Sequence, residues 1–457
     1  MRFEHLKSAV VAIGLGAALS WGNPARAEDP NAILDLLERK ELITHEEAQQ
    51  ARKYYDKQMK DAVVKNDKMK VGSWIDEMKW SSDLRLRTEY FDNEDQNNPS
   101  DRWRFRYRLR LGIEAQFANW ATLGLRLASG DANDPVSTNE TFDDTFQKDP
   151  IQIDAAYAII QPPGWNWVSV TGGKMNNPIY QPAFASPLVY DFDVTPEGVA
   201  EQFAFKFGAD GRHTLFLNLG EFVLNEISSS ADTDGFLFDM QGGAEFKFGK
   251  NAAKPVLRAK VAGGFLWTDN VDVGSQQTDS PNVGNAVSIS GTTTNVLADF
   301  EVVHVNGEIA WQLSEEPLLG TPVVITASGE YVKNLAGAFD TLSGASTNIA
   351  PDQTVGWTGQ ITFGSNKKKG EWQLGYQYKY LEADAVYAEL SDSDWGLGGT
   401  DRKGHAVKAT YNFQDWWQLG LTAFITEKIS NRTGANTVPA VNHKELLRVQ
   451  IDNVWKF

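Results

Sequence analysis

The sequence predicts an all-β fold, a transmembrane antiparallel β-barrel of about 16 strands that follows a short N-terminal helical segment. Three observations lead to this prediction. From Trp80 to the end of the 457-residue chain, polar and apolar side chains alternate in segments of roughly ten residues. Short polar turns and long loops rich in Asp, Ser, Asn and Gly alternate between these segments. The number of segments is even, which is typical of bacterial outer-membrane barrels.

Residues 1–27 have the pattern of a secretory signal peptide. Arg2 and Lys7 precede the apolar run AVVAIGLGAAL, and Ala25 and Ala27 supply the small residues of a cleavage site. The apolar run is shorter than the roughly 20 residues that a membrane-spanning helix needs, which disfavours a retained membrane anchor. We therefore expect cleavage after Ala27.

Residues 28–70 show helical rather than strand periodicity. Ile33, Leu34 and Leu37 share one helical face, and the sequence THEE at 44–47 has the pattern of a capping box that opens a second helix. Apolar residues recur at steps of three or four along that second helix. A short periplasmic coiled coil and a helix packed beneath the main domain both fit this pattern.

Residues 71–457 form the predicted barrel domain. The expected strands are 81–91, 102–117, 120–130, 150–161, 166–175, 198–207, 213–225, 236–248, 255–267, 300–313, 322–332, 354–364, 371–382, 402–413, 416–428 and 443–457. Tight turns such as GADGRH, GSNKKKGE and NFQDWW are expected to face the periplasm, and loops such as 268–299 and 383–401 to face outside. A soluble sandwich or propeller also has many strands, but it does not need apolar residues on the outward face of nearly every strand.

The segment RWRFRYRLRL, residues 102–111, indicates which face of the wall is polar. As a strand it places every arginine on one face and every large apolar side chain on the other. Five arginines turned toward lipid would cost on the order of 10–20 kcal/mol, at about 2–4 kcal/mol each, so we expect them to face the lumen. The same register on neighbouring strands predicts a pore-lining set: Arg85, Arg87, Arg104, Arg106, Arg108, Arg110 and Arg126.

A row of like charges needs water or carboxylates opposite it. Arginines two residues apart on a strand lie about 6.6 Å apart and repel by about 2.5 kcal/mol at an effective dielectric constant of about 20. The connection at 176–197 is long, rich in proline and aromatic residues, and carries Asp191, Asp193 and Glu197. We expect this loop to fold into the lumen and to constrict it.

Composition and motifs exclude several function classes. A net charge of −17 disfavours a nucleic-acid-binding protein, and the absence of cysteine excludes disulfides and thiolate metal sites. The six histidines show no metal-ligand spacing, and no nucleophile elbow, phosphate-binding loop or dinucleotide fingerprint occurs. The acidic clusters DTDG at 232–235 and SDSDWG at 391–396 do not complete a calcium loop and are interpreted as solvated loop tips. We expect no enzyme activity, no cofactor, no metal and no nucleic-acid partner.

Five stretches carry a resemblance to a known family: LLERKELITHEEAQQ, DLRLRTEYF, RWRFRYRLRLG, DSDWGLGGTDRKGHAVKATYNF and the closing VQIDNVWKF. On these stretches the chain resembles the bacterial "putative porin" family and is similar to the diffusion porins of the outer membrane, over essentially the whole mature chain. The resemblance implies a water-filled barrel, usually a homotrimer, narrowed by an inward-folded third external loop that faces a cluster of arginines. It implies that role for the loop acids Asp191, Asp193 and Glu197 and for the wall arginines named above.

The last predicted strand gives a second, independent signal. Phe457 is preceded on the same face by Trp455, Ile451 and Val449. This ending resembles that of outer-membrane barrels, whose last strand ends on an aromatic residue that their assembly machinery recognises. The resemblance implies that Trp455 and Phe457 are the assembly signal. Tryptophans at strand ends on the short-turn side predict an aromatic girdle at the membrane interface: Trp80, Trp120, Trp165, Trp167, Trp311, Trp372, Trp416, Trp417 and Trp455.

Two function hypotheses follow, and both place the barrel among outer-membrane lipids with its N-terminal segment in the periplasm. In the first, small hydrophilic solutes or ions diffuse passively through the lumen, with a weak anion preference set by the arginines. In the alternative, the barrel only anchors external loops for adhesion and periplasmic helices that tether the cell wall. Conductance across a planar bilayer distinguishes the two.

Overall fold

The computed structural model describes residues 74–93, 101–143, 145–182, 185–226, 234–250, 255–271, 284–285, 287–290, 293–296, 299–336, 353–429 and 445–457. The predicted signal peptide (1–27) and the predicted helical segment (28–70) lie outside the described residues. Within these ranges, no helix is long and apolar enough to cross a membrane.

Sixteen long strands, all close to their predicted positions, build the described wall. They are β1 (Glu77–Asn93), β2 (Arg102–Phe117), β3 (Ala121–Ala128), β5 (Gln152–Ile160), β6 (Val168–Lys174), β7 (Glu197–Phe207), β8 (His213–Asn225), β9 (Gly235–Phe248), β10 (Leu257–Asp269), β13 (Glu301–Leu318), β14 (Thr321–Asn334), β15 (Val355–Gly364), β16 (Trp372–Leu381), β17 (Arg402–Gln414), β18 (Trp417–Lys428) and β19 (Glu445–Lys456).

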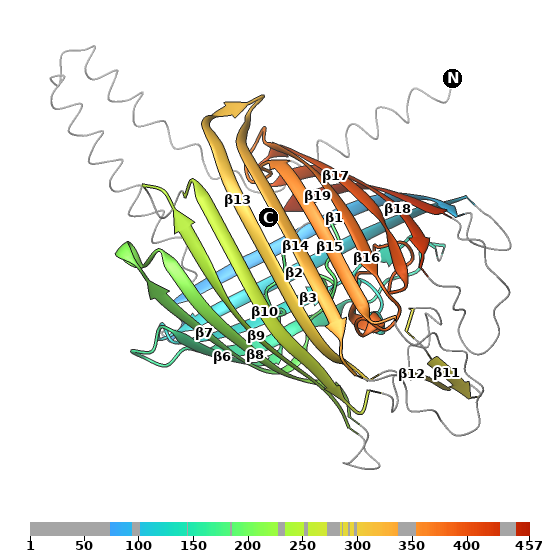
Figure 1. Ribbon diagram of the computed structural model, residues 1–457, viewed down its shortest axis with the longest axis horizontal. Coiled ribbons are helices and arrows are strands. Elements are labelled where there is room, and N and C mark those ends of the chain that lie inside the picture. The colour runs from blue at the N-terminus through green and yellow to red at the C-terminus, as the bar shows by residue number, and fades with distance from the viewer. Residues whose placement is uncertain are drawn as a thin grey trace, which may run out of the picture. The chain divides into compact units, whose positions relative to one another are not determined.

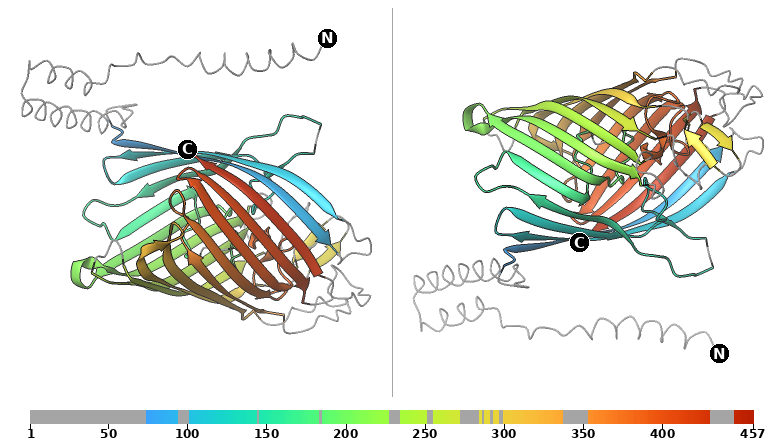
Figure 2. Two further views of the ribbon diagram at one scale, coloured as in Figure 1. Left: turned by 90° about the horizontal axis from the view of Figure 1, so that it is seen from above. Right: turned by 90° about the horizontal axis from the view of Figure 1, so that it is seen from below.

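These strands form one antiparallel sheet that closes on itself. Each long strand pairs with the next one along the chain, and β1 pairs with β19, from Asp83 opposite Lys456 to Asn93 opposite Leu446. Figure 1 shows the tilted strands of the wall, and in Figure 2 the first strand (blue) lies beside the last one (red). The prediction of a closed antiparallel barrel is confirmed.

The connections alternate in length, as predicted. Short turns join the strands at one end of the barrel, at 118–120, 161–167, 208–212, 249–256, 319–320, 365–371 and 415–416. The turn at 118–120 places two residues in the left-handed region, with φ of 49° at Ala118 and 59° at Asn119. The opposite end, called the loop end below, carries the long connections.

Three small strands were not predicted from the sequence. β4 (Glu140–Thr141) pairs with β2 beyond the point where β3 ends, opposite Arg106 and Tyr107. β11 (Val287–Ser290) and β12 (Thr293–Val296) form a separate hairpin between β10 and β13. Strands this short lack the repeated alternation from which the long strands were inferred.

The two faces of the wall follow the alternation in the sequence. On β2 the apolar side chains Trp103, Phe105 and Leu111 are exposed on the outer face, whereas Arg108 between them is buried. Since a strand turns successive side chains to opposite faces, Arg104, Arg106 and Arg110 share this inward face with Arg108, and polar residues continue it toward the short turn. The wall is therefore apolar outside and polar inside.

Aromatic side chains mark both ends of the outer face. Trp80, Trp120 and Trp311 are exposed beside the short turns, where the girdle was predicted. The loop end has an aromatic set of its own that the sequence pattern did not predict, including Trp103, which packs on Tyr90 with ring centroids 5.0 Å apart. Two such levels fit the two interfaces of a membrane.

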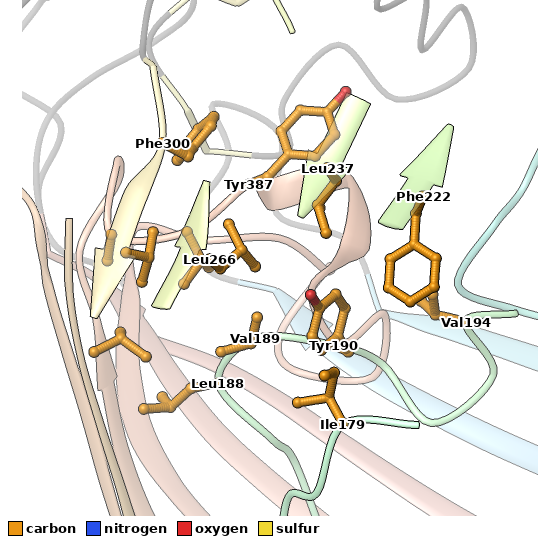
Figure 3. Close-up of a cluster of buried hydrophobic side chains, with 14 of the residues drawn as sticks. Ile179, Leu188, Val189, Tyr190, Val194, Phe222, Leu237, Leu266, Phe300 and Tyr387 are labelled. Atoms are coloured by element: carbon orange, nitrogen blue, oxygen red, sulfur yellow. The ribbon is translucent and has the colours of Figure 1, made fainter. Parts of the chain in front are cut away.

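A hydrophobic cluster lies inside the loop end of the barrel (Figure 3). It joins the third long loop, L3 (residues 175–196), and the seventh, L7 (residues 382–401), to the inner faces of several strands. Its labelled members are Ile179, Leu188, Val189, Tyr190, Val194, Phe222, Leu237, Leu266, Phe300 and Tyr387. Burial of each large apolar side chain contributes about 1.5–3 kcal/mol, so this cluster fixes both loops within the barrel.

Candidate functional site

L3 lies inside the barrel and is held by side chains on the inward faces of distant strands. Gln241 of β9 accepts a hydrogen bond from the Tyr180 amide and donates one to the Tyr180 carbonyl, both at 2.8 Å. Gln377 of β16 makes the same pair of bonds with Ser186, at 3.0 and 2.6 Å. These side-chain amides satisfy the backbone of L3 as a neighbouring strand would, because buried unpaired backbone groups are costly.

Two buried charged side chains hold the middle of L3. The Lys379 ammonium donates to the Ser186 hydroxyl at 2.8 Å and to the Pro187 carbonyl at 2.7 Å. The Glu330 carboxylate accepts from the Leu188 amide at 3.1 Å. L3 thus spans the interior toward β14 and β16, on the side of the barrel away from its own strands.

L7 packs on L3 at Asp191. The Asp191 amide donates to the Leu390 carbonyl at 2.8 Å, and its carboxylate accepts from the amide and the hydroxyl of Ser393, at 2.9 and 3.1 Å. Burial, together with the carboxylates of Asp392 and Asp193, raises the pKa of Asp191 well above its ordinary value. Asp191 therefore joins the two loops and makes no ion pair with the wall arginines among the described residues.

The interpretation of SDSDWG at 391–396 as a solvated loop tip is wrong, because L7 folds into the barrel. Asp392 is only 5% exposed and Trp395 is completely buried. Trp395 packs edge-on against Phe424 of β18. Its indole supplies the apolar area that draws this acidic segment into the barrel, an effect that counting charges does not reveal. The first two residues of the cluster DTDG lie outside the described residues.

The inward arginines of β1 and β19 bind carboxylates on both strands and on L7. Arg87 holds Asp452 through two nitrogens, at 2.7 and 2.9 Å, and contacts Asp394 of L7 at 2.9 Å. Arg448 contacts Glu89 at 2.5 Å and Asp394 at 2.9 Å. Burial would raise the pKa of Asp394, but Arg87 and Arg448 outweigh it and hold that pKa well below its ordinary value.

Arg108 and Arg110 of β2 share two carboxylates in the same way. Asp83 on β1 accepts from both arginines at 2.8 Å. Asp193 of L3 lies 3.4 Å from Arg108 and 3.2 Å from Arg110. Burial would raise the pKa of Asp193, but the two guanidiniums hold it below its ordinary value. The structure thus brings one of the three predicted loop acids to the arginines.

The remaining arginines of β1 and β2 differ in their partners. Arg104 contacts Glu89 at 2.6 Å. Arg85 donates to the Asn139 side-chain oxygen at 2.5 Å, and Arg106 donates to the Asn139 carbonyl at 3.2 Å. The wall is therefore a mixed network in which acids on the strands themselves, and not only on the loop, face the arginines.

Arg126 and Glu197 lie outside this network. Arg126 of β3 contacts Asp154 on β5 and donates to Asn176 of L3 at 2.7 Å. Glu197 is the first residue of β7, where it faces Lys174 across the β6–β7 pair at 2.9 Å. Glu197 therefore does not face the arginines, because its strand register places it at the root of L3 and not at its tip.

The predicted assembly residues lie at the end of the closing strand. Trp455 lies opposite Leu84 of β1 and stacks on Trp417 of β18 with ring centroids 6.3 Å apart. Phe457 follows β19, is 71% exposed, and donates its amide to the Ser82 carbonyl at 3.0 Å. Their role as a signal remains a prediction.

Several residues of the network were missed by sequence reasoning. Arg448 and Asp452 share the inward face of β19, a signal that the strand alternation does contain. Asp394 and Asn139 come from long loops, whose paths the sequence pattern does not determine. No group of three or more metal-ligating side chains is placed to hold a metal within the described ranges.

A separate polar set lies nearer the short turns. Arg258 of β10 contacts Glu308 of β13, and Glu245 of β9 lies 3.5 Å from Arg258. Lys260 places its ammonium 3.5 Å from the centre of the Tyr180 ring. The interior is therefore charged over its length and not only at the loop end.

A family model described as "Putative porin" matches residues 93–277 and 276–439. The chain belongs to this porin family. The comparison with curated proteins finds no match.

Solved structures with a similar barrel include two from Vibrio cholerae. Outer-membrane expressed OmpT is 11% identical, with a TM-score of 0.42, over 83% of this porin and 97% of that chain. In-vitro folded OmpT in a trimer form is 14% identical, with a TM-score of 0.42, over 83% of this porin and 99% of that chain. A mutant of the Rhodopseudomonas blastica porin is 10% identical, with a TM-score of 0.40, over 83% and 100%.

Proposed function

We propose that this porin forms a water-filled channel through which small hydrophilic solutes diffuse passively across the bacterial outer membrane. One observation carries the proposal: a closed barrel has an apolar outer face and a charged inner face. An interior built only to stabilise the fold would not need buried arginines, since replacing buried ion pairs by apolar groups is often neutral or stabilising. In a water-filled passage, the same charges contact solutes and determine which ions pass.

We further propose that the passage is narrowed by L3, L7 and the arginines of β1 and β2. Asp193 reaches Arg108 and Arg110 from L3, and Asp394 reaches Arg87 from L7. These contacts place both loops against the arginine wall. The arginines give the passage a weak preference for anions.

Planar-bilayer recordings of the purified chain test the proposal. We expect discrete conductance steps and, under a salt gradient, a reversal potential displaced toward that of the anion. The double variant Arg106→Gln/Arg108→Gln removes two inward charges, so the permeability ratio of anion to cation should fall. Arg212→Gln, in an exposed turn beside Asp210, is the matched control. A barrel that folds but never conducts would contradict the channel and favour an anchor for adhesion or cell-wall tethering.

We also propose that the porin is a homotrimer, assembled with the help of the outer-membrane assembly machinery. The apolar outer face leaves room for contact between copies as well as with lipid. The mass of the protein–detergent complex, corrected for bound detergent, checks the oligomeric state. A mass of one chain would contradict the trimer.

A further inference from the structure

Charge balance divides the inward arginines of β1, β2 and β19 into two kinds. Five arginines are joined by ion pairs to five carboxylates; the arginines are Arg87, Arg104, Arg108, Arg110 and Arg448, and the carboxylates are Asp83, Glu89, Asp193, Asp394 and Asp452. Within this set each positive charge has a negative one. The set is therefore close to neutral and explains how L3 and L7 are attached to the wall.

Arg85 and Arg106 stand apart from this balanced set. Their hydrogen-bond partners are neutral: Arg85 reaches the Asn139 side chain, and Arg106 reaches the Asn139 carbonyl at 3.2 Å and the Ser137 hydroxyl at 3.5 Å. Neither forms an ion pair with a described residue. The Nε of each guanidinium is also without a hydrogen-bond acceptor among the described residues. Within the described part of the chain, two neighbouring guanidiniums thus have no carboxylate in direct contact.

The strand register brings these two arginines together. Arg85 lies opposite Arg108, and Arg87 lies opposite Arg106, so Arg85 and Arg106 are diagonal neighbours on the inward face. Diagonal neighbours in an antiparallel pair are about 7–8 Å apart, and both side chains converge on Asn139. Both arginines are also partly exposed, in contrast to the buried Arg87.

We propose that Arg85 and Arg106 form a binding site for a small oxyanion, a phosphate or a carboxylate. The planar guanidinium presents paired N–H donors that match two oxygens of one anion, so an oxyanion can bridge both arginines. Chloride has a single centre and cannot offer a separate acceptor atom to each guanidinium. The site deepens the proposed channel function by naming the class of solute that the passage retains, but binding itself does not depend on conduction.

Isothermal titration calorimetry on the full chain in detergent tests the site, with inorganic phosphate, acetate and chloride at constant ionic strength. We expect saturable heat with phosphate, with acetate or with both, and none with chloride. Arg106→Gln should weaken oxyanion binding about tenfold, because one charge-assisted pair of contacts is lost. Arg258→Gln, an inward arginine already paired with Glu308, is the matched control and should retain binding within about threefold.

A second variant tests the site without removing an arginine. Asn139→Asp places a carboxylate where Arg85 already donates and next to the backbone carbonyl that accepts from Arg106, so it should occupy the site and abolish oxyanion binding. Binding that stays unchanged in both Arg106→Gln and Asn139→Asp, or heat that is equal for chloride and phosphate, would overturn the site.

The failure of this site is distinguishable from the failure of the channel. If the barrel conducts but shows no saturable oxyanion binding, the proposed site is wrong and the proposed channel function stands. If the barrel does not conduct but binds phosphate through Arg106, the proposed site stands and the proposed channel function is wrong. Circular dichroism of each variant confirms that the barrel has folded.

Discussion

Glu89 shows at the scale of one residue how the barrel tolerates charges in its interior. Its side chain is completely buried, yet it accepts from Arg104 at 2.6 Å, from Arg448 at 2.5 Å and from Gln450 at 3.1 Å. The guanidiniums also lie over an aromatic ring there, with Arg104 and Arg448 each about 5 Å from the centre of the Phe91 ring. A buried carboxylate is stable in this site because both of its oxygens accept from charged donors.

Replacing Glu89 by glutamine should therefore be strongly destabilising. The change leaves Arg104 without its carboxylate partner, and breaking a buried ion pair from one side costs about 3–5 kcal/mol. Reversible urea unfolding in phospholipid vesicles measures the free energy. Asp210→Asn removes an exposed turn carboxylate paired with Arg212, and its free energy of unfolding should change by less than about 1 kcal/mol. An equal decrease in the free energy of unfolding of the two variants would contradict this role of Glu89.

At the scale of loops and strands, L3 and L7 carry two kinds of carboxyl group. Asp193 and Asp394 face arginines and have lowered pKa values, so their contribution to stability is present at neutral pH and is lost only in strong acid. Burial beside other acids raises the pKa of Asp191 instead. The contribution of Asp191 is complete below its ordinary pKa and is lost as the pH rises through the raised value.

The contact between L3 and L7 should therefore loosen with increasing pH. We expect the amide of Ser393, which donates to Asp191, to exchange hydrogen faster as the pH rises through the raised pKa of Asp191, after correction for intrinsic exchange. Asp191→Asn removes the titrating group and should flatten that dependence. An unchanged pH profile in this variant would show that another group controls the contact.

The sequence predicted the strands far better than the loop paths. A strand repeats its alternation over many residues, so the alternation alone was enough to assign Arg85 and Arg108 to the inward face. The position of L3 followed in outline from its prolines and acids. The exact partners did not, because Gln241, Gln377 and Lys379 meet L3 only after the barrel has closed, and their separation in sequence leaves no local pattern.

At the scale of the whole molecule, one register governs which side of the wall meets lipid. Leu125 of β3 is 41% exposed on the outer face, and Thr122 lies on the inner face of the same strand. Leu125→Arg should decrease the free energy of unfolding in vesicles by about 2–4 kcal/mol for a side chain near the membrane midplane. Thr122→Arg, with its side chain inside, should change it by less than about 1 kcal/mol. Similar costs at the two positions would contradict the assigned faces.

The seam between β1 and β19 has a consequence for how the chain folds. Arg87 and Asp452 meet there although 365 positions separate them, whereas the other neighbouring long strands of the described wall are consecutive. Joining ends so distant costs about 5 kcal/mol of chain entropy, more than closing the much shorter loops of the hairpins. The hairpins can therefore form early as an open curved sheet, and the seam is sealed last. Weakening the Arg87–Asp452 pair should slow the final closure while leaving the earlier acquisition of β structure unchanged.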